Sequence, residues 1–131
     1  MFLTRDDNKD WDTELDIYVY DGRRSIVAQR ARQMGEFGEG TNIPLKLDRF
    51  GVIAEEDIDS CSTTLVIVPN GNDTWRFDYE VDFSFEDGRA VGRKFFHKSL
   101  SEEKLTETYR LQEAIPVAPD PDHARDVPTF P

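Results

Sequence analysis

The chain has 131 residues and a formal net charge of −11, from 27 acidic and 16 basic side chains. This length is typical of a single domain whose core needs no cross-links, and the single cysteine excludes an internal disulfide. The acidity disfavours nucleic acid and anionic membranes as partners, because both carry phosphate, and leaves metal cations, a protein or a glycan.

No hydrophobic run is long enough to insert into a membrane, and no signal peptide is visible near the N-terminus. The expected location is therefore either the cytoplasm or an exported compartment that is reached through a signal outside this sequence. The composition does not indicate an oligomeric state.

The first elements of the chain read as a β-hairpin. Residues 13–20 (TELDIYVY) alternate, and residues 25–30 (SIVAQR) form a second strand after Asp21-Gly22. Asp-Gly between two such runs favours a hairpin turn, because both residues tolerate positive φ. The first strand has an inward aliphatic set and two tyrosines on the opposite face: Leu15, Ile17 and Val19 against Tyr18 and Tyr20.

Two further strands and one helical turn are expected before the middle of the chain. Residues 43–47 (IPLKL) alternate and begin beside a proline, which is typical of an edge strand. Residues 55–60 are acidic and predict a short helical turn, and residues 63–68 (TTLVIV) predict a buried strand.

The longest alternating run is residues 74–85, TWRFDYEVDFSF. Only a strand places its apolar residues on one face, because successive side chains of a strand point to opposite sides. The inward set is Trp75, Phe77, Tyr79, Val81, Phe83 and Phe85, and the opposite face, expected to be wet, carries Asp78, Glu80 and Asp82. A second Asp-Gly turn, Asp87-Gly88, then predicts a hairpin with residues 89–98.

The last expected strand is residues 105–111, although residues 101–104 resemble a helix start and leave a short helix as the alternative. Residues 114–131 contain five prolines and no periodic apolar face, which predicts a flexible tail. The sequence thus predicts an all-β protein, an antiparallel β-sandwich of about 7–8 strands over residues 1–113, with an acidic N-terminal loop at 1–12.

Oxygen-bearing side chains are concentrated in segments that alternating strand directions bring to one end of this sandwich. Calcium is bound by roughly six to eight oxygens from such loops. The predicted calcium ligands are Asp6, Asn8, Asp10, Asp12, Asn70, Asn72 and Asp73. The EF-hand pattern is excluded, because Trp11 and Ile17 occupy its glycine and glutamate positions. Asp and Asn also form turns at strand ends, so turn chemistry is the alternative interpretation.

Acidic loops at one end of a sandwich of about eight strands resemble the calcium-binding PLAT and C2 domain families over residues 10–113. The resemblance lies in the architecture and involves no matched motif. It implies a binding or interaction module that holds calcium in its end loops. The basic and apolar loop tips with which such domains grip membranes are missing from this sequence, so lipid binding is not implied.

Three functional hypotheses follow. The first is a non-enzymatic binding or interaction module with a candidate calcium site. The second is a metal-free structural or accessory subunit that acts through sheet edges and the Pro-rich tail. The third is a carbohydrate-binding module, or a hydrolase that uses the acidic row of residues 78–82, whose members lie about 7 Å apart along a strand. No Ser/His/Asp or Cys/His set can be assembled, and Cys61 reads as a small core thiol.

Overall fold

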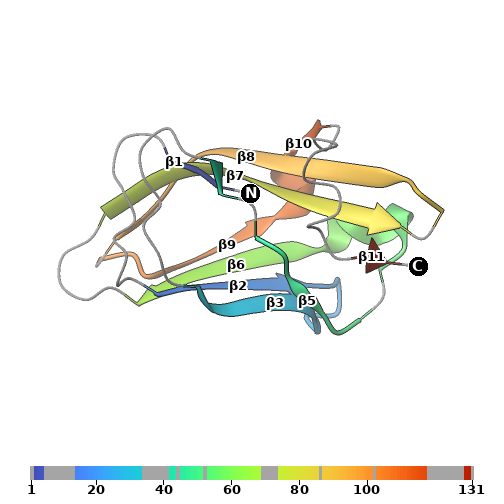
Figure 1. Ribbon diagram of the computed structural model, residues 1–131, viewed down its shortest axis with the longest axis horizontal. Helices are drawn as coiled ribbons and strands as arrows, with labels where there is room; N and C mark the ends of the chain where they lie inside the picture. The colour runs from blue at the N-terminus through green and yellow to red at the C-terminus, as the bar shows by residue number, and fades with distance from the viewer. Residues whose placement is uncertain are drawn as a thin grey trace.

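The chain folds into two β-sheets that face each other across a hydrophobic core (Figure 1). The computed structural model describes residues 2–4, 14–33, 42–43, 45–51, 53–68, 74–85, 87–101, 103–117 and 129–130. The predicted all-β sandwich is confirmed, and the two helices within these residues are short 3-10 segments, η1 (Glu55–Ser60) and η2 (Leu111–Glu113).

One sheet, called the six-stranded sheet, is built on the two longest strands. Its order is β4 (Asn42–Ile43), β1 (Phe2–Thr4), β7 (Thr74–Phe85), β8 (Ala90–Ser101) and β10 (Ile115–Val117), and β11 (Thr129–Phe130) pairs with β7. The pairing of β7 with β11 is parallel, and the other described pairings of this sheet are antiparallel.

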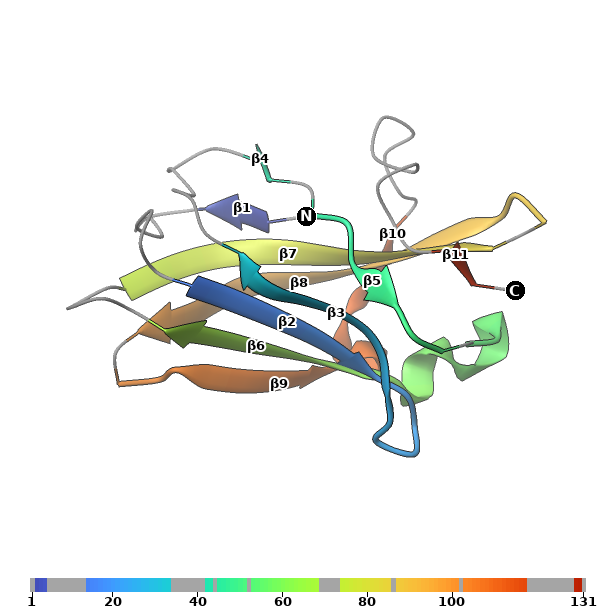
Figure 2. The same ribbon diagram turned by 60° about the horizontal axis from the view of Figure 1, so that its bottom comes forward.

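The other sheet, called the five-stranded sheet, faces the viewer in Figure 2. Its order is β5 (Asp48–Arg49), β3 (Ile26–Gln33), β2 (Glu14–Tyr20), β6 (Ser62–Val68) and β9 (Thr106–Arg110), all antiparallel. The last strand expected from the sequence, over residues 105–111, is therefore confirmed as β9, and the alternative of a short helix is not adopted.

Both Asp-Gly pairs lie in hairpin connections, but the loops have three residues instead of two. In the first, the Asp21 N–H donates to the Ser25 carbonyl at 2.9 Å, and in the second, the Phe85 N–H donates to the Arg89 carbonyl at 2.8 Å. Three-residue loops need positive φ at the last loop position. Gly88 supplies it with φ 88°, whereas in the first loop Arg24 does so with φ 64°.

Each hairpin also has a β-bulge that an aspartate closes. The register shifts opposite Asp16 in the first hairpin and opposite Asp78 in the second. In each case a residue of the return strand has positive φ, Arg32 at 56° and His97 at 58°. Its N–H donates to the aspartate Oδ1, at 2.6 Å from Arg32 and 2.9 Å from His97. The two aspartate side chains thus replace the ladder hydrogen bonds that a bulge removes.

The alternating pattern of β7 places its apolar residues in the core as predicted. Trp75, Phe77 and Phe83 are almost completely buried, and they face the aliphatic side chains of β2 and β6. The Tyr79 hydroxyl is hydrogen-bonded to Thr63 Oγ1 at 2.6 Å, so the buried phenol keeps a partner.

The expected N-terminal loop begins with a strand, which is a difference from the sequence analysis. β1 pairs with β7, and the Phe2 ring is buried among the aromatic rings of that strand. Ring centroids of Trp75, Phe77 and Tyr79 lie 5.2, 5.6 and 5.6 Å from that of Phe2. A strand of three residues is too short for periodicity to reveal it.

The predicted strand over residues 43–47 is wrong. β4 belongs to the six-stranded sheet and β5 to the five-stranded sheet, so the chain crosses from one layer to the other over residues 45–47 (Figure 2). Leu47 is buried at the crossing and Leu45 is half-buried, which explains the alternation without a strand.

Two short parts of the expected tail pair with the six-stranded sheet. β10 lies beside β8, and β11 lies beside the end of β7. Each contributes only two or three residues to the sheet. A proline-rich composition does not indicate such pairing, because edge strands tolerate proline.

Candidate functional site

The seven predicted calcium ligands all lie outside the described residues: Asp6, Asn8, Asp10, Asp12, Asn70, Asn72 and Asp73. The calcium site therefore stays a prediction. Among the residues that the structure describes, no group of three or more His, Cys, Asp or Glu side chains could hold a metal ion.

The strand ends that flank the acidic segments do gather at one end of the sandwich. β2 begins next to the end of β6, where Glu14 pairs with Val68, and β7 begins next to the end of β8, where Thr74 pairs with Ser101. Both places lie at the left of Figure 1. The alternating strand directions assumed in the sequence analysis are thus present in both sheets.

The acidic face of β7 is not wet, which corrects the sequence analysis. Asp78, Glu80 and Asp82 lie on the side opposite the core, as their parity predicts, but they are 0%, 8% and 7% exposed. Parity determines the face of a sheet on which a residue lies and carries no information about what covers that face.

Neighbouring residues of β8 explain how these carboxylates are accommodated. Asp78 accepts the His97 N–H at the bulge, and the register places Lys94 opposite Glu80. Asp82 leans over Gly92, where a Cβ atom would lie only 2.7 Å from the Asp82 Oδ1. A glycoside hydrolase needs carboxylates that its substrate can reach, so this row offers no support for the hydrolase hypothesis.

The aromatic row of β7 is likewise unavailable as a platform for sugars, because the described rings are buried in the core. The tyrosines of β2 are different. Tyr18 and Tyr20 lie on the outer face of the five-stranded sheet, half-buried, with ring centroids 6.3 Å apart.

An open groove of about 860 Å³ crosses this outer face next to the β2–β3 turn. Its lining comes from three neighbouring strands, the turn and the end of η1: Tyr20, Asp21, Gly22, Arg24, Asp59, Ser60, Cys61, Ser62, Thr64, Thr108, Arg110 and Gln112. Most of these residues carry polar or charged side chains, although more of the exposed lining surface is apolar than polar. Figure 2 shows the β2–β3 turn and η1 side by side at the start of β6.

The register aligns the strand residues of the groove in two rows. Tyr20 pairs with Ser62, which pairs with Arg110, and the next row outward from the turn joins Thr64 to Thr108. The two threonine hydroxyls of that row are hydrogen-bonded at 2.8 Å. Cross-strand contacts of this kind hold the hydroxyls of the groove in fixed positions on a rigid sheet.

The β2–β3 turn, which borders the groove, is also held by internal hydrogen bonds. Asp21 Oδ1 accepts the N–H groups of Arg23 and Ser25, both at 2.9 Å. Gly22 approaches η1 so closely that a Cβ atom there would lie 2.9 Å from Ser60 Oγ. A larger residue at this position would therefore require the Ser60 side chain to shift.

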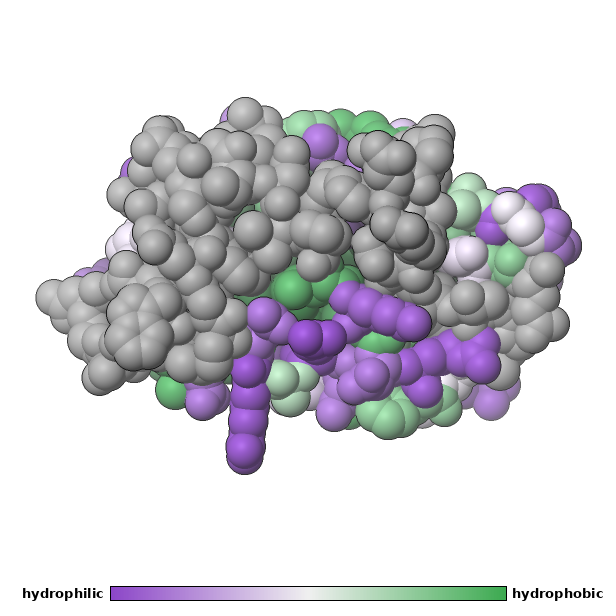
Figure 3. All heavy atoms as spheres, in the orientation of Figure 1, coloured by the Kyte–Doolittle hydropathy of each residue, from purple (hydrophilic) through white to green (hydrophobic). Residues whose placement is uncertain are grey.

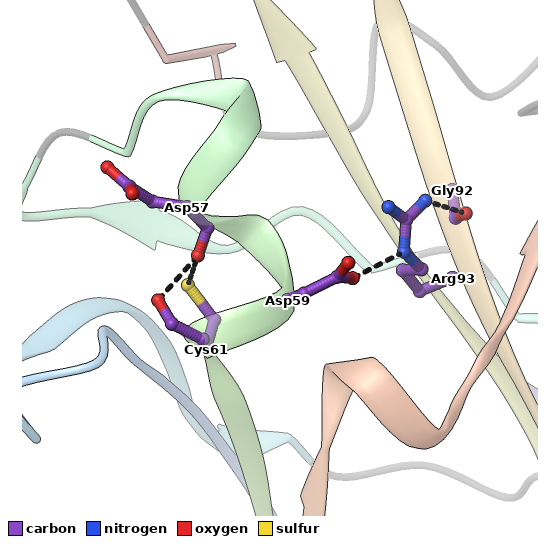
Figure 4. A network of polar contacts seen from close by, with 6 residues as sticks. Asp57, Asp59, Cys61, Gly92 and Arg93 are labelled. Atoms are coloured by element: carbon purple, nitrogen blue, oxygen red, sulfur yellow. Dashed lines mark hydrogen bonds and ion pairs between the residues drawn. The ribbon is translucent and has the colours of Figure 1, made fainter.

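η1, which lies beside this turn, is connected with the six-stranded sheet by a polar network (Figure 4). Asp59 forms an ion pair with Arg93 Nε of β8 at 3.5 Å, and Arg93 Nη1 donates to the Gly92 carbonyl at 3.1 Å. The ion pair is largely exposed on the Asp59 side, so it contributes little to the stability of the fold.

Cys61 lies under the groove with its thiol directed at the Asp57 carbonyl, 3.5 Å away (Figure 4). Burial, together with the smaller effect of the nearby Asp21 and Asp57 carboxylates, raises the pKa of this thiol to about 11. The thiol is therefore protonated at neutral pH and is a poor nucleophile, in agreement with the core role expected from the sequence.

The rest of the visible surface is predominantly hydrophilic. In Figure 3 hydrophilic side chains gather along the lower side of the molecule, over β3 and β5, and several separate apolar patches lie among and around them. Exposed large apolar residues of the described chain are spread over separate elements: Ile26, Phe50, Val68, Leu105 and Ile115. Scattered apolar residues of this kind are ordinary on a protein surface.

The fold and the groove define the chain as an all-β sandwich with a polar, open surface on one sheet. No protein-family model matches the sequence, and the comparisons with curated proteins and with solved structures give no match either. No helix within the described residues is long and apolar enough to cross a membrane. The PLAT and C2 resemblance thus stays a prediction from architecture.

The sequence analysis did not identify the groove, although part of its signal was present. The outward parity of β2 places Tyr20 beside Tyr18, and TTLVIV and LTETYRL each alternate hydroxyl-bearing residues with buried ones. These patterns indicate a polar outer face. That the β2–β3 turn and η1 close one end of it depends on tertiary packing, which no local pattern encodes.

Proposed function

We propose that the protein is a non-enzymatic binding module whose ligand surface is the groove on the outer face of the five-stranded sheet. The observation that carries the proposal is the joint origin of the groove. Three adjacent strands, a turn and a 3-10 helix contribute polar side chains to one open surface, and internal hydrogen bonds hold the turn and the pair of threonine hydroxyls.

The ionisable groups around the groove favour recognition over catalysis. Asp21 is engaged by two turn N–H groups and Asp59 by Arg93. Burial keeps the pKa of the Cys61 thiol near 11, so it supplies no nucleophile at neutral pH. Side chains that are held by their own neighbours are suited to presenting fixed donors and acceptors to a partner.

The test is a binding screen with two matched arginine substitutions on β9. Thr108 lines the groove, whereas Thr106 is exposed on the same face of the same strand and lies outside the lining. Wild type, Thr108→Arg and Thr106→Arg are applied to immobilised neutral glycans, anionic glycans and short peptides. We expect ligands that are retained by wild type and Thr106→Arg to be lost by Thr108→Arg. Equal retention by all three proteins would refute the groove as the ligand surface.

Calcium binding by the acidic loops is a second candidate function. Its support is that the strand ends flanking these loops lie at one end of the sandwich. A site formed by Asp6, Asn8, Asp10 and Asp12 with the 70–73 segment would stabilise the fold by about 2.7 kcal/mol at a hundredfold excess of calcium over Kd.

Calorimetric titration with calcium, together with thermal melts in calcium and in chelator, tests this site. The comparison is wild type beside the double variant Asp10→Ala, Asp12→Ala. We expect heat and a higher melting temperature in wild type only. If wild type shows neither heat nor a higher melting temperature, the calcium site is refuted and the acidic residues are explained by their role in turns. The metal-free accessory subunit stays the remaining alternative.

A further inference from the structure

The charges that line the groove balance each other, although the chain as a whole is strongly acidic. The lining contains two arginines, Arg24 and Arg110, and two aspartates, Asp21 and Asp59, whereas the full sequence has a net charge of −11. A surface that attracted phosphates or other anions would carry an excess of arginine and lysine. One that attracted a basic peptide would carry an excess of carboxylates. The groove favours neither, so its charge matches an uncharged ligand.

The donors and acceptors of the lining are mixed. Hydroxyl groups, which both donate and accept, come from Ser60, Ser62, Thr64 and Thr108, and Gln112 adds an amide. Arginine donates only and an ionised carboxylate accepts only. A ligand that carries many hydroxyl groups can pair with each of these kinds of group, because each hydroxyl can take either role.

An aromatic ring borders these polar groups. Tyr20 lines the groove, and Tyr18 continues the aromatic surface along β2 with its ring centroid 6.3 Å from that of Tyr20. Tyrosine offers an apolar ring face with a polar tip. The C–H face of a pyranose ring is apolar while its rim carries hydroxyls, so a sugar can contact the ring and the hydroxyl row together.

We propose that the ligand of the groove is a neutral oligosaccharide or polysaccharide, with Tyr20 as the stacking residue. The inference depends on the proposed function of the groove and names its ligand class. The groove is an open surface and not a closed cavity. Such a surface is better suited to a chain of sugar units that extends beyond the site than to a small free metabolite.

The experiment is a calorimetric titration with neutral hexasaccharides of glucose, mannose and xylose, beside polygalacturonate, heparin and an oligolysine peptide. Four proteins are compared: wild type, Tyr20→Phe, Tyr20→Ala and Thr108→Arg. We expect a neutral hexasaccharide to bind wild type and Tyr20→Phe, because both keep the ring. Binding should decrease at least tenfold in Tyr20→Ala and be lost in Thr108→Arg. Unchanged circular dichroism spectra and melting temperatures establish that the variants are folded.

The remaining outcomes separate the two proposals. One outcome is that a charged polymer binds wild type and not Thr108→Arg, while no neutral hexasaccharide binds. The neutral-glycan inference is then overturned and the proposed binding module stands. If Tyr20→Ala binds the hexasaccharide as wild type does, Tyr20 is not the stacking residue and the inference is also overturned. If none of the probes binds wild type, both the ligand class and the groove as a ligand surface are overturned.

Discussion

Replacing Phe2 with alanine removes the ring that joins β1 to the aromatic core. Phe2 is 3% exposed, and its ring lies within 5.6 Å, centroid to centroid, of Trp75, Phe77 and Tyr79. Truncating a buried phenylalanine costs about 3–5 kcal/mol, which includes the cavity that is left. Since β1 is short, we expect the lower half of this range.

Thermal and urea denaturation followed by circular dichroism measure this loss. About 4 °C per kcal/mol applies to a chain of this length, so the melting temperature should decrease by about 12–16 °C. The matched control is Phe50→Ala, because Phe50 is 61% exposed. Its expected effect is within about 0.5 kcal/mol of wild type.

Equal and small effects of the two substitutions would refute the reasoning. They would mean that β1 detaches from β7 at little cost and that the aromatic cluster closes without Phe2. A loss near 3 kcal/mol for Phe2→Ala alone would instead show that the first strand is an integral part of the six-stranded sheet.

Three other predictions address the outer face of β8, the thiol and the bulges. Gly92→Ala should destabilise the fold by about 1–3 kcal/mol in urea denaturation, because its Cβ would lie 2.7 Å from the Asp82 carboxylate; a neutral substitution would contradict the close approach. Alkylation of Cys61 should be about a hundredfold slower in the folded than in the urea-unfolded protein at pH 8, because its pKa is raised from 9.0 to about 11. The same shift makes the unfolded state lose its proton first, so folding stability should decrease as the pH increases above 9; equal alkylation rates would contradict both statements. Asp16→Ala should cost about 1 kcal/mol, because the Arg32 N–H loses its acceptor at 2.6 Å, whereas Asp16→Asn should retain most of the stability; equal losses in the two variants would show that the hydrogen bond does not account for the effect.

Strand identity and the orientation of side chains could be predicted from the sequence wherever alternation is long. The pattern of residues 74–85 correctly assigns Trp75, Phe77 and Phe83 to the core. The Asp-Gly pairs correctly indicate both hairpins, although Arg24 rather than glycine takes the left-handed position in the first. These features are local, because adjacent residues determine both the parity of a strand and the chemistry of a turn.

Features that depend on distant segments could not be predicted. β1 needs β7 beside it before three residues can count as a strand, and the crossing at 45–47 depends on β4 and β5 joining different sheets. The burial of Asp82 depends on β8 leaving room at Gly92. The groove belongs to the same class, since the polar rows are visible in the sequence while its walls are formed by tertiary contacts.

The aspartate-closed bulges have a consequence for how the length of this chain can vary. Each one fixes the number of residues between a hairpin turn and the position where Asp16 or Asp78 meets its left-handed partner. An inserted or deleted residue inside that interval would move every later side chain of the return strand to the opposite face of the sheet. In related sequences we therefore expect gaps to fall beyond the bulges, after Arg32 or His97, and the interval from turn to bulge to keep a constant length.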